Sequence, residues 1–219
     1  MSRELLPEEF PRHLAMLSKG ARIIQERENV LPHPGLHYLQ LGVGTFRLLV
    51  SSADPITREP LLGFTHGLLD KARGLIRPNS FQFAEATHFL GLTDLGIAVW
   101  SRSRKVADRS VKLLREAASH SSVADLEELG LIDFSTKVVG AESLQEILQD
   151  ELVEPDEKLA ERLTTTPFDI SEFINWTTRE RTKHISEWRA VIEKERSPRI
   201  KKLQLELFNQ MVADESSED

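Results

Sequence analysis

Apolar side chains recur at intervals of three and four along most of this 219-residue chain, which is the spacing that one face of an α-helix presents. The clearest runs cover residues 60–77 and 104–119, with further ones at 8–28, 123–129 and 143–152. Ser143 and Glu146 have the spacing of a capping box at the start of the last run. The pattern predicts a mainly α fold, a compact multi-helix core followed by a helical C-terminal region.

One stretch is ambiguous between helix and strand. Phe81 and Phe83, and further along Ile97 and Val99, alternate with other residues as in short strands. The fold prediction therefore leaves room for one minor strand pair beside the helices.

The segment LQLGVGTFRLL at residues 39–49 raises the question of a phosphate-binding loop. A dinucleotide loop requires glycine at three positions of G-x-G-x-x-G, and Arg47 stands at the third. We interpret Gly42 and Gly44 as structural, lying in an apolar segment over residues 36–50 where they permit close backbone packing.

Charge divides the chain near residue 140. Residues 142–161 hold eight acids and one base, whereas residues 172–202 hold nine bases and five acids. We predict a helical core domain at 1–140, a C-terminal helical region at 141–213 that is acidic and then basic, and a disordered acidic tail at 214–219.

The C-terminal region carries an apolar seam. A long helix is predicted from about Ile170 to Arg196, and a last helix over 199–212. Ile185, Trp188 and Ile192 repeat at three and four residues on the long helix, as in helices that pack on a partner or on a second copy of the chain.

A basic stripe gives a second hypothesis. Residues 100–115 hold six bases and one acid. On a helix, Arg102, Lys105, Arg109 and Lys112 share one face, and Trp100 could stack on a base at its head. Such a stripe is typical of a helix that lies along a phosphate backbone, although it also suits a solvated helix face with Trp100 in the core. The candidate nucleic-acid residues are Trp100, Arg102, Lys105, Arg109, Lys112 and Arg115.

Local motifs for catalysis, metals and cofactors are missing from the sequence. The chain has no cysteine, no H-E-x-x-H and no G-x-S-x-G, and Pro34 and Gly35 separate His33 from His37. We expect no cofactor and no metal, and we leave open an enzyme whose site is not readable from local motifs. Ser216 and Ser217, followed by Glu218 and Asp219, resemble an acidophilic kinase site.

The favoured function is a non-enzymatic helical interaction protein that self-associates or binds a protein partner through its C-terminal helices. RNA binding by the stripe is the alternative. The net charge of −7 argues against indiscriminate nucleic-acid binding. The sequence shows neither a signal peptide nor a membrane-spanning run, so we expect no membrane insertion and a cytoplasmic or nuclear location.

Overall fold

The computed structural model describes residues 10–51, 55–150 and 154–165, together with six positions between 190 and 202. Eight helices lie in the three ranges, and no strand occurs there. They are α1 (Phe10–Arg27), α2 (Pro34–Ser51), α3 (Pro55–Leu75), α4 (Phe81–Ser101), α5 (Arg104–Ala118), α6 (Ser121–Glu128), α7 (Ser135–Asp150) and α8 (Glu157–Thr165). The mainly α prediction is confirmed.

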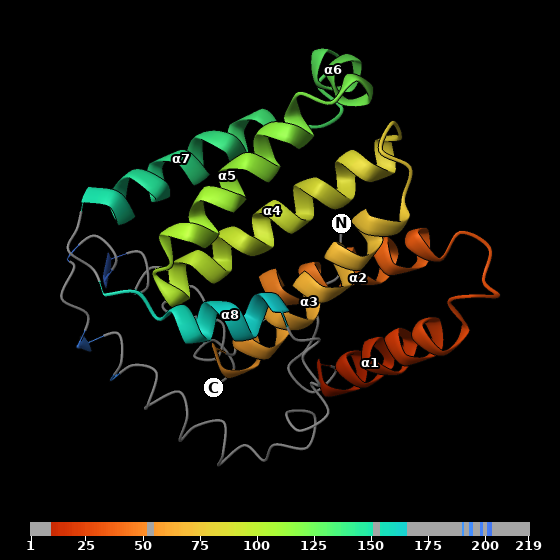
Figure 1. The fold of residues 1–219 in the computed structure, drawn as a ribbon, viewed down its shortest axis with the longest axis horizontal. Helices are drawn as coiled ribbons and strands as arrows, with labels where there is room; N and C mark the ends of the chain where they lie inside the picture. Colours follow the sequence, from red (N-terminus) through yellow and green to blue (C-terminus); the bar gives the residue numbers. More distant parts are fainter. Residues whose placement is uncertain are drawn as a thin grey trace, which may run out of the picture.

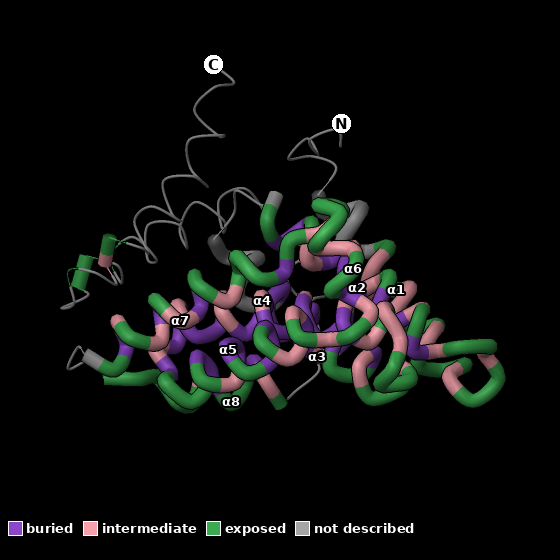
Figure 2. The backbone as a smooth tube through the Cα atoms, turned by 90° about the horizontal axis from the view of Figure 1, so that it is seen from above, coloured by how far each residue is buried: buried purple, intermediate pink, exposed green. Residues whose placement is uncertain are grey.

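Neighbouring helices pack mostly in chain order. α2 packs on α3, α3 on α4, and α4 on α5, while α7 packs on the outer side of α5 (Figure 1). α1 flanks α2 at the other edge, and the short α8 lies against α3 and α4 (Figure 1). The buried positions lie along the middle of this array, with exposed positions at its rim (Figure 2).

Polar side chains fix where several helices begin. Ser80 accepts the Phe83 N–H at the start of α4, and Ser103 accepts the Val106 N–H at the start of α5. Asp133 Oδ1 accepts the Thr136 N–H at 3.1 Å before α7. Each of these side chains satisfies a backbone donor that has no partner within its helix.

The prediction of a minor strand pair is wrong, because its residues lie in α4. Phe81, Phe83, Ile97 and Val99 all lie on this one helix of 21 residues. Its residues are buried or partly buried on every side except at Gln82, so no polar face marks the helical period. The short alternations in the sequence therefore come from a central helix that is apolar all round.

The helices also differ from the prediction in places. α7 begins at Ser135 rather than at residue 143, and the Ser143 hydroxyl donates to the Val139 carbonyl at 3.0 Å inside the helix. α8 follows the helix predicted at 143–152, over residues where the sequence pattern predicted no further helix. The predicted division near residue 140 stays a prediction, although Gly140 lies within α7 and Leu144 and Leu148 of that helix join the main core.

The glycine segment lies within α2. A Cβ on Gly42 would stand 2.7 Å from Leu69 Cδ2, whereas one on Gly44 would meet only Leu17, at 3.8 Å. α2 and α3 thus approach closely at Gly42. The structural interpretation is confirmed for this glycine, because its missing side chain makes room for Leu69.

Candidate functional site

The charged residues of the basic stripe have different surroundings. Arg109 pairs with Asp94 of α4, and Arg115 pairs with Glu142 of α7 at 2.6 Å. Lys105 and Lys112 are exposed and form no ion pair among the described residues. Each arginine pair directs its charge to a neighbouring helix instead of to a common face.

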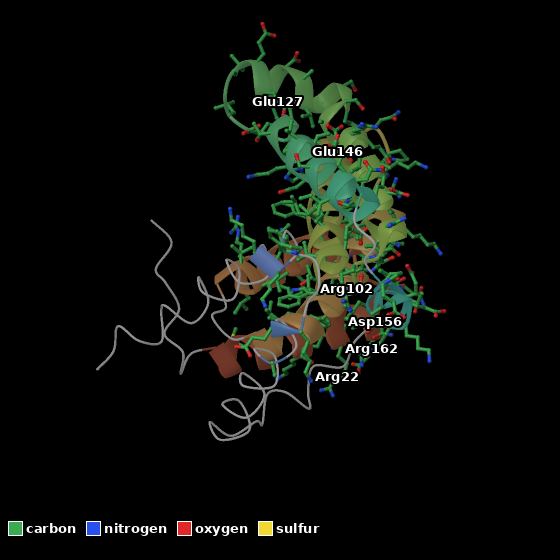
Figure 3. All side chains as sticks on the ribbon, turned by 90° about the vertical axis from the view of Figure 1, so that its left-hand side faces the viewer. Arg22, Arg102, Glu127, Glu146, Asp156 and Arg162 are labelled. Carbon is green, nitrogen blue, oxygen red and sulfur yellow. The ribbon has the colours of Figure 1, made fainter. Side chains whose placement is uncertain are left out.

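The two residues at the head of the stripe lie off α5. Arg102 joins α4 to α5 with a φ of 56° and lies beside the start of α8, near Asp156 (Figure 3). Trp100 belongs to α4 and is 8% exposed within the main core. Of the two interpretations of Trp100, stacking on a base or packing in the core, this burial supports packing in the core.

A buried polar junction joins the helices α3, α4 and α5. Arg109 of α5 donates through Nε to Asp94 Oδ2 and through Nη2 to Asp94 Oδ1, the latter at 2.6 Å. The same Nη2 lies 2.9 Å from Nε2 of His66 on α3. The Asp94 side chain is fully buried and that of His66 is 4% exposed, whereas 41% of the Arg109 side chain is exposed. The junction is therefore open to solvent only at Arg109.

Close packing of α4 on α5 positions this junction. The Ser110 hydroxyl, next to Arg109, donates to the Gly91 carbonyl of α4 at 2.8 Å. A Cβ on Gly91 would stand 2.8 Å from Leu114 Cγ, so glycine is needed for this approach. Gly91 lies one helical turn before Asp94 on α4, so the two contacts place Arg109 beside the Asp94 carboxylate.

Burial sets the protonation states of the junction. It raises the pKa of Asp94 to about 6, against the opposing effect of the Arg109 cation. Burial first, and Arg109 second, lower the pKa of His66 to about 3. At neutral pH Asp94 is thus ionised and His66 is neutral, with Nε2 as the acceptor of the Arg109 N–H. The Nη1 group of Arg109 has no hydrogen-bond partner in the described part of the chain.

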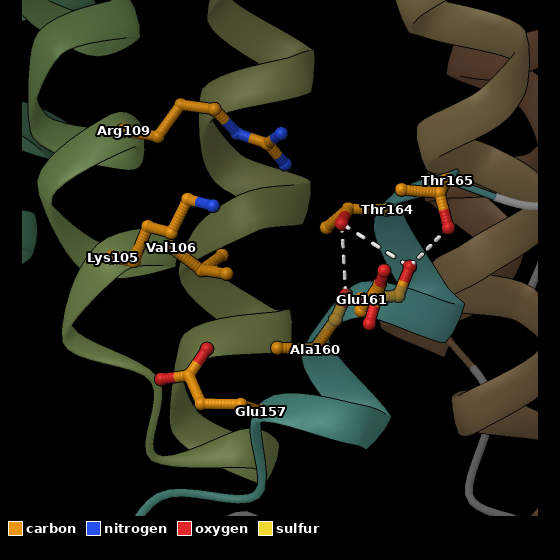
Figure 4. Close-up of a pocket in the computed structure, with 8 residues that line it drawn as sticks. All are labelled: Lys105, Val106, Arg109, Glu157, Ala160, Glu161, Thr164 and Thr165. Atoms are coloured by element: carbon orange, nitrogen blue, oxygen red, sulfur yellow. Dashed lines mark hydrogen bonds between the residues drawn. The ribbon is translucent and has the colours of Figure 1, made fainter.

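Arg109 also lines a cleft between α5 and α8 (Figure 4). The cleft has a volume of about 470 Å³. Lys105 and Arg109 reach into it from α5, and Glu157 and Glu161 line it from α8 (Figure 4). The remaining lining residues are Val106, Ala160, Thr164 and Thr165.

Short contacts hold α8 at the edge of this cleft. The Asp156 N–H donates to the Ser101 carbonyl at 2.7 Å, and the Ser103 hydroxyl lies 3.0 and 3.1 Å from the two carboxylate oxygens of Glu157. No ion pair joins the α5 wall to the α8 wall among the described residues. Cations and carboxylates therefore line the same cleft without pairing.

Sequence reasoning missed most of this site. It named Lys105 and Arg109 but not His66, Asp94, Glu157 or Glu161. Asp94 left one usable signal, because a single carboxylate within the apolar run GLTDLGI requires a buried partner. The predicted association residues Ile185, Trp188 and Ile192, and the phosphorylation residues Ser216 and Ser217, lie outside the described residues.

Comparison with family models, with curated proteins and with solved structures finds no match to this chain. Within the described ranges, no helix has both the length and the apolar character needed to cross a bilayer. The same residues hold no group of three or more histidine, aspartate or glutamate side chains placed to bind a metal ion.

Proposed function

We propose that this chain is a non-enzymatic interaction protein and that its helical body contacts a protein partner at the cleft between α5 and α8. The observation that supports this most is the opposed pair of charged walls, Lys105 and Arg109 against Glu157 and Glu161, with no ion pair between them in the described structure. Facing charges that stay apart keep their hydrogen-bonding capacity for a bound molecule.

The non-enzymatic part of the proposal is supported by the enclosure of the polar junction. Both oxygens of Asp94 are engaged by Arg109, and neither Asp94 nor His66 reaches the surface. A general acid or base must come within hydrogen-bond distance of its substrate. In this arrangement the two groups position Arg109 and do not meet a ligand.

Two sequence-based hypotheses keep their own tests. Association through residues 170–212 is tested by comparing the mass of the full chain with that of a chain ending at residue 168, using light scattering. RNA binding now depends mainly on the exposed Lys105 and Lys112, and a steep fall of RNA affinity with salt would support it.

Site-directed photo-crosslinking tests the cleft itself. A photoreactive residue replaces Thr165 at the edge of the cleft, and in a matched control it replaces Glu146, which is exposed on α7. We expect one discrete protein adduct from position 165, its loss when Lys105→Glu is added, and no such adduct from position 146. Equal crosslinking from both positions, or no effect of Lys105→Glu, would refute the proposal. Purified protein alone shows whether the adduct is a second copy.

A further inference from the structure

We infer that the partner segment entering the α5–α8 cleft carries one acidic and one basic side chain, the acid facing α5 and the base facing α8. This inference rests on the proposed function, because it names the chemistry of the segment that the cleft would hold. It follows from how the donors and acceptors of the two walls are already engaged.

The α5 wall offers donors only. Arg109 uses Nε and Nη2 for Asp94 and His66, which leaves the two N–H groups of Nη1 without a partner among the described residues. Lys105, one helical turn earlier, adds an ammonium group with no ion pair in that part of the chain. A carboxylate fits both groups, since it accepts several charge-assisted hydrogen bonds.

The α8 wall offers acceptors. Glu157 and Glu161 are one turn apart and both line the cleft, and Glu157 is already oriented by the Ser103 hydroxyl. The hydroxyls of Thr164 and Thr165 donate to backbone carbonyls of α8 at 2.9 and 2.6 Å, so their oxygens remain acceptors. An ammonium or guanidinium group fits this wall, because it is a donor with no acceptor.

The net charge of the cleft indicates which side chain of the segment, the acidic or the basic one, contributes more to affinity. Asp94 is ionised at neutral pH and offsets the charge of Arg109. The remaining charges that line the cleft are the cation of Lys105 and the carboxylates of Glu157 and Glu161. The cleft region is therefore net negative. A segment with both charges should bind best, a segment with only the base should come second, and one with only the acid should bind most weakly.

Three blocked alanine-based peptides test this ranking by isothermal titration calorimetry on the full chain at low salt. The first has a glutamate and a lysine four residues apart. The second replaces the glutamate by glutamine, and the third replaces the lysine by methionine. We expect the order of affinity first, second, third. Free aminohexanoate is a fourth probe, and if it binds while no peptide does, the cleft takes a small zwitterion and the inference is overturned.

Variants of each wall should affect different peptides. Lys105→Met should weaken the first peptide about two- to fivefold and leave the second unchanged, since an exposed ion pair contributes up to about 1 kcal/mol. Glu161→Gln should weaken the first and second peptides by a similar factor and spare the third. Lys112→Met and Glu146→Gln, which remove exposed charges outside the cleft, should change nothing.

The outcomes separate this inference from the proposed function. The titrations need no natural partner, so they report on the chemistry of the cleft alone. Absence of binding by all three peptides, or equal effects of Lys105→Met and Lys112→Met, would overturn the inference. Loss of the crosslinked adduct on Lys105→Glu would still support the cleft as a contact site in that case.

Discussion

Substituting the two partners of the buried ion pair should destabilise the fold unequally. The Asp94 side chain is fully buried, whereas 41% of the Arg109 side chain is exposed. Arg109→Met leaves the Asp94 carboxylate out of reach of water and without its two donors. Asp94→Asn leaves a guanidinium that can turn to solvent and an amide oxygen that can still accept one hydrogen bond.

The expected magnitudes follow from this asymmetry. Breaking a buried ion pair by removing one partner costs about 3–5 kcal/mol. The pKa of Asp94 is already about 6, and loss of the Arg109 cation raises it further, so protonation limits the cost of Arg109→Met to about 3 kcal/mol at pH 7. For Asp94→Asn we expect about 1 kcal/mol, because it removes the buried charge, keeps one hydrogen bond and leaves a guanidinium that water can reach.

The stability cost of Arg109→Met should depend on pH. Asp94 is ionised in the native protein only above its raised pKa of about 6, so the contribution of Arg109 is present above that pH and is lost below it. The cost of Arg109→Met should therefore shrink between pH 7 and pH 5.

Urea unfolding followed by far-ultraviolet circular dichroism measures these differences at both pH values. Arg115→Met is the control, since it removes a pair whose arginine is 63% exposed and should cost less than about 1 kcal/mol at either pH. An Asp94→Asn variant that loses as much stability as Arg109→Met at pH 7 would refute the reasoning, as would a cost of Arg109→Met that is the same at pH 5.

Three further predictions concern stability alone. Gly42→Ala should cost about 1–3 kcal/mol because its Cβ would meet Leu69, whereas Gly44→Ala should be neutral or slightly stabilising; thermal melts that show equal effects would contradict the packing argument. Burial lowers the pKa of His88 to about 4, so the contribution of this group to stability, present above pH 6.5, should fall by about 3 kcal/mol towards pH 4, and the difference between the stability profiles of the wild type and His88→Leu should show that fall. Trp100→Ala should cost about 3–5 kcal/mol in urea unfolding, and a cost below 1 kcal/mol would place the ring outside the core.

The helical fold was predictable wherever one face of a helix is polar. The run at 104–119 became α5 almost unchanged, because its charged residues leave a clear apolar stripe. α4 was ambiguous for the opposite reason, since a helix enclosed by neighbours on nearly all sides has no polar face to reveal its period. The start of α7 was missed because Asp133, its capping residue, was not recognised, and Ser143 offered a competing motif inside the helix.

The candidate site was predictable only in its residue types. Spacing alone placed Lys105 and Arg109 on one face of a helix, which is correct, but spacing cannot say which helix lies opposite. That depends on the chain returning after α7 so that Asp156 bonds to Ser101 and α8 packs on α3 and α4, across a cleft from α5. Contacts between residues so distant in sequence leave no local pattern.

The two exposed lysines of the stripe show how the surroundings of a residue depend on the helix that lies opposite. Lys105 and Lys112 lie two helical turns apart on α5, with the same charge and similar exposure, and the sequence treats them alike. Only Lys105 lines the cleft, since α8 lies opposite the first turns of α5 and not the later ones. The same holds for the arginines, because Arg109 meets a fully buried carboxylate while Arg115 meets a partly exposed one. A stripe of like charges on one helix therefore divides into a cleft wall, an ion pair with a buried carboxylate and a solvated surface according to the helices packed beside it.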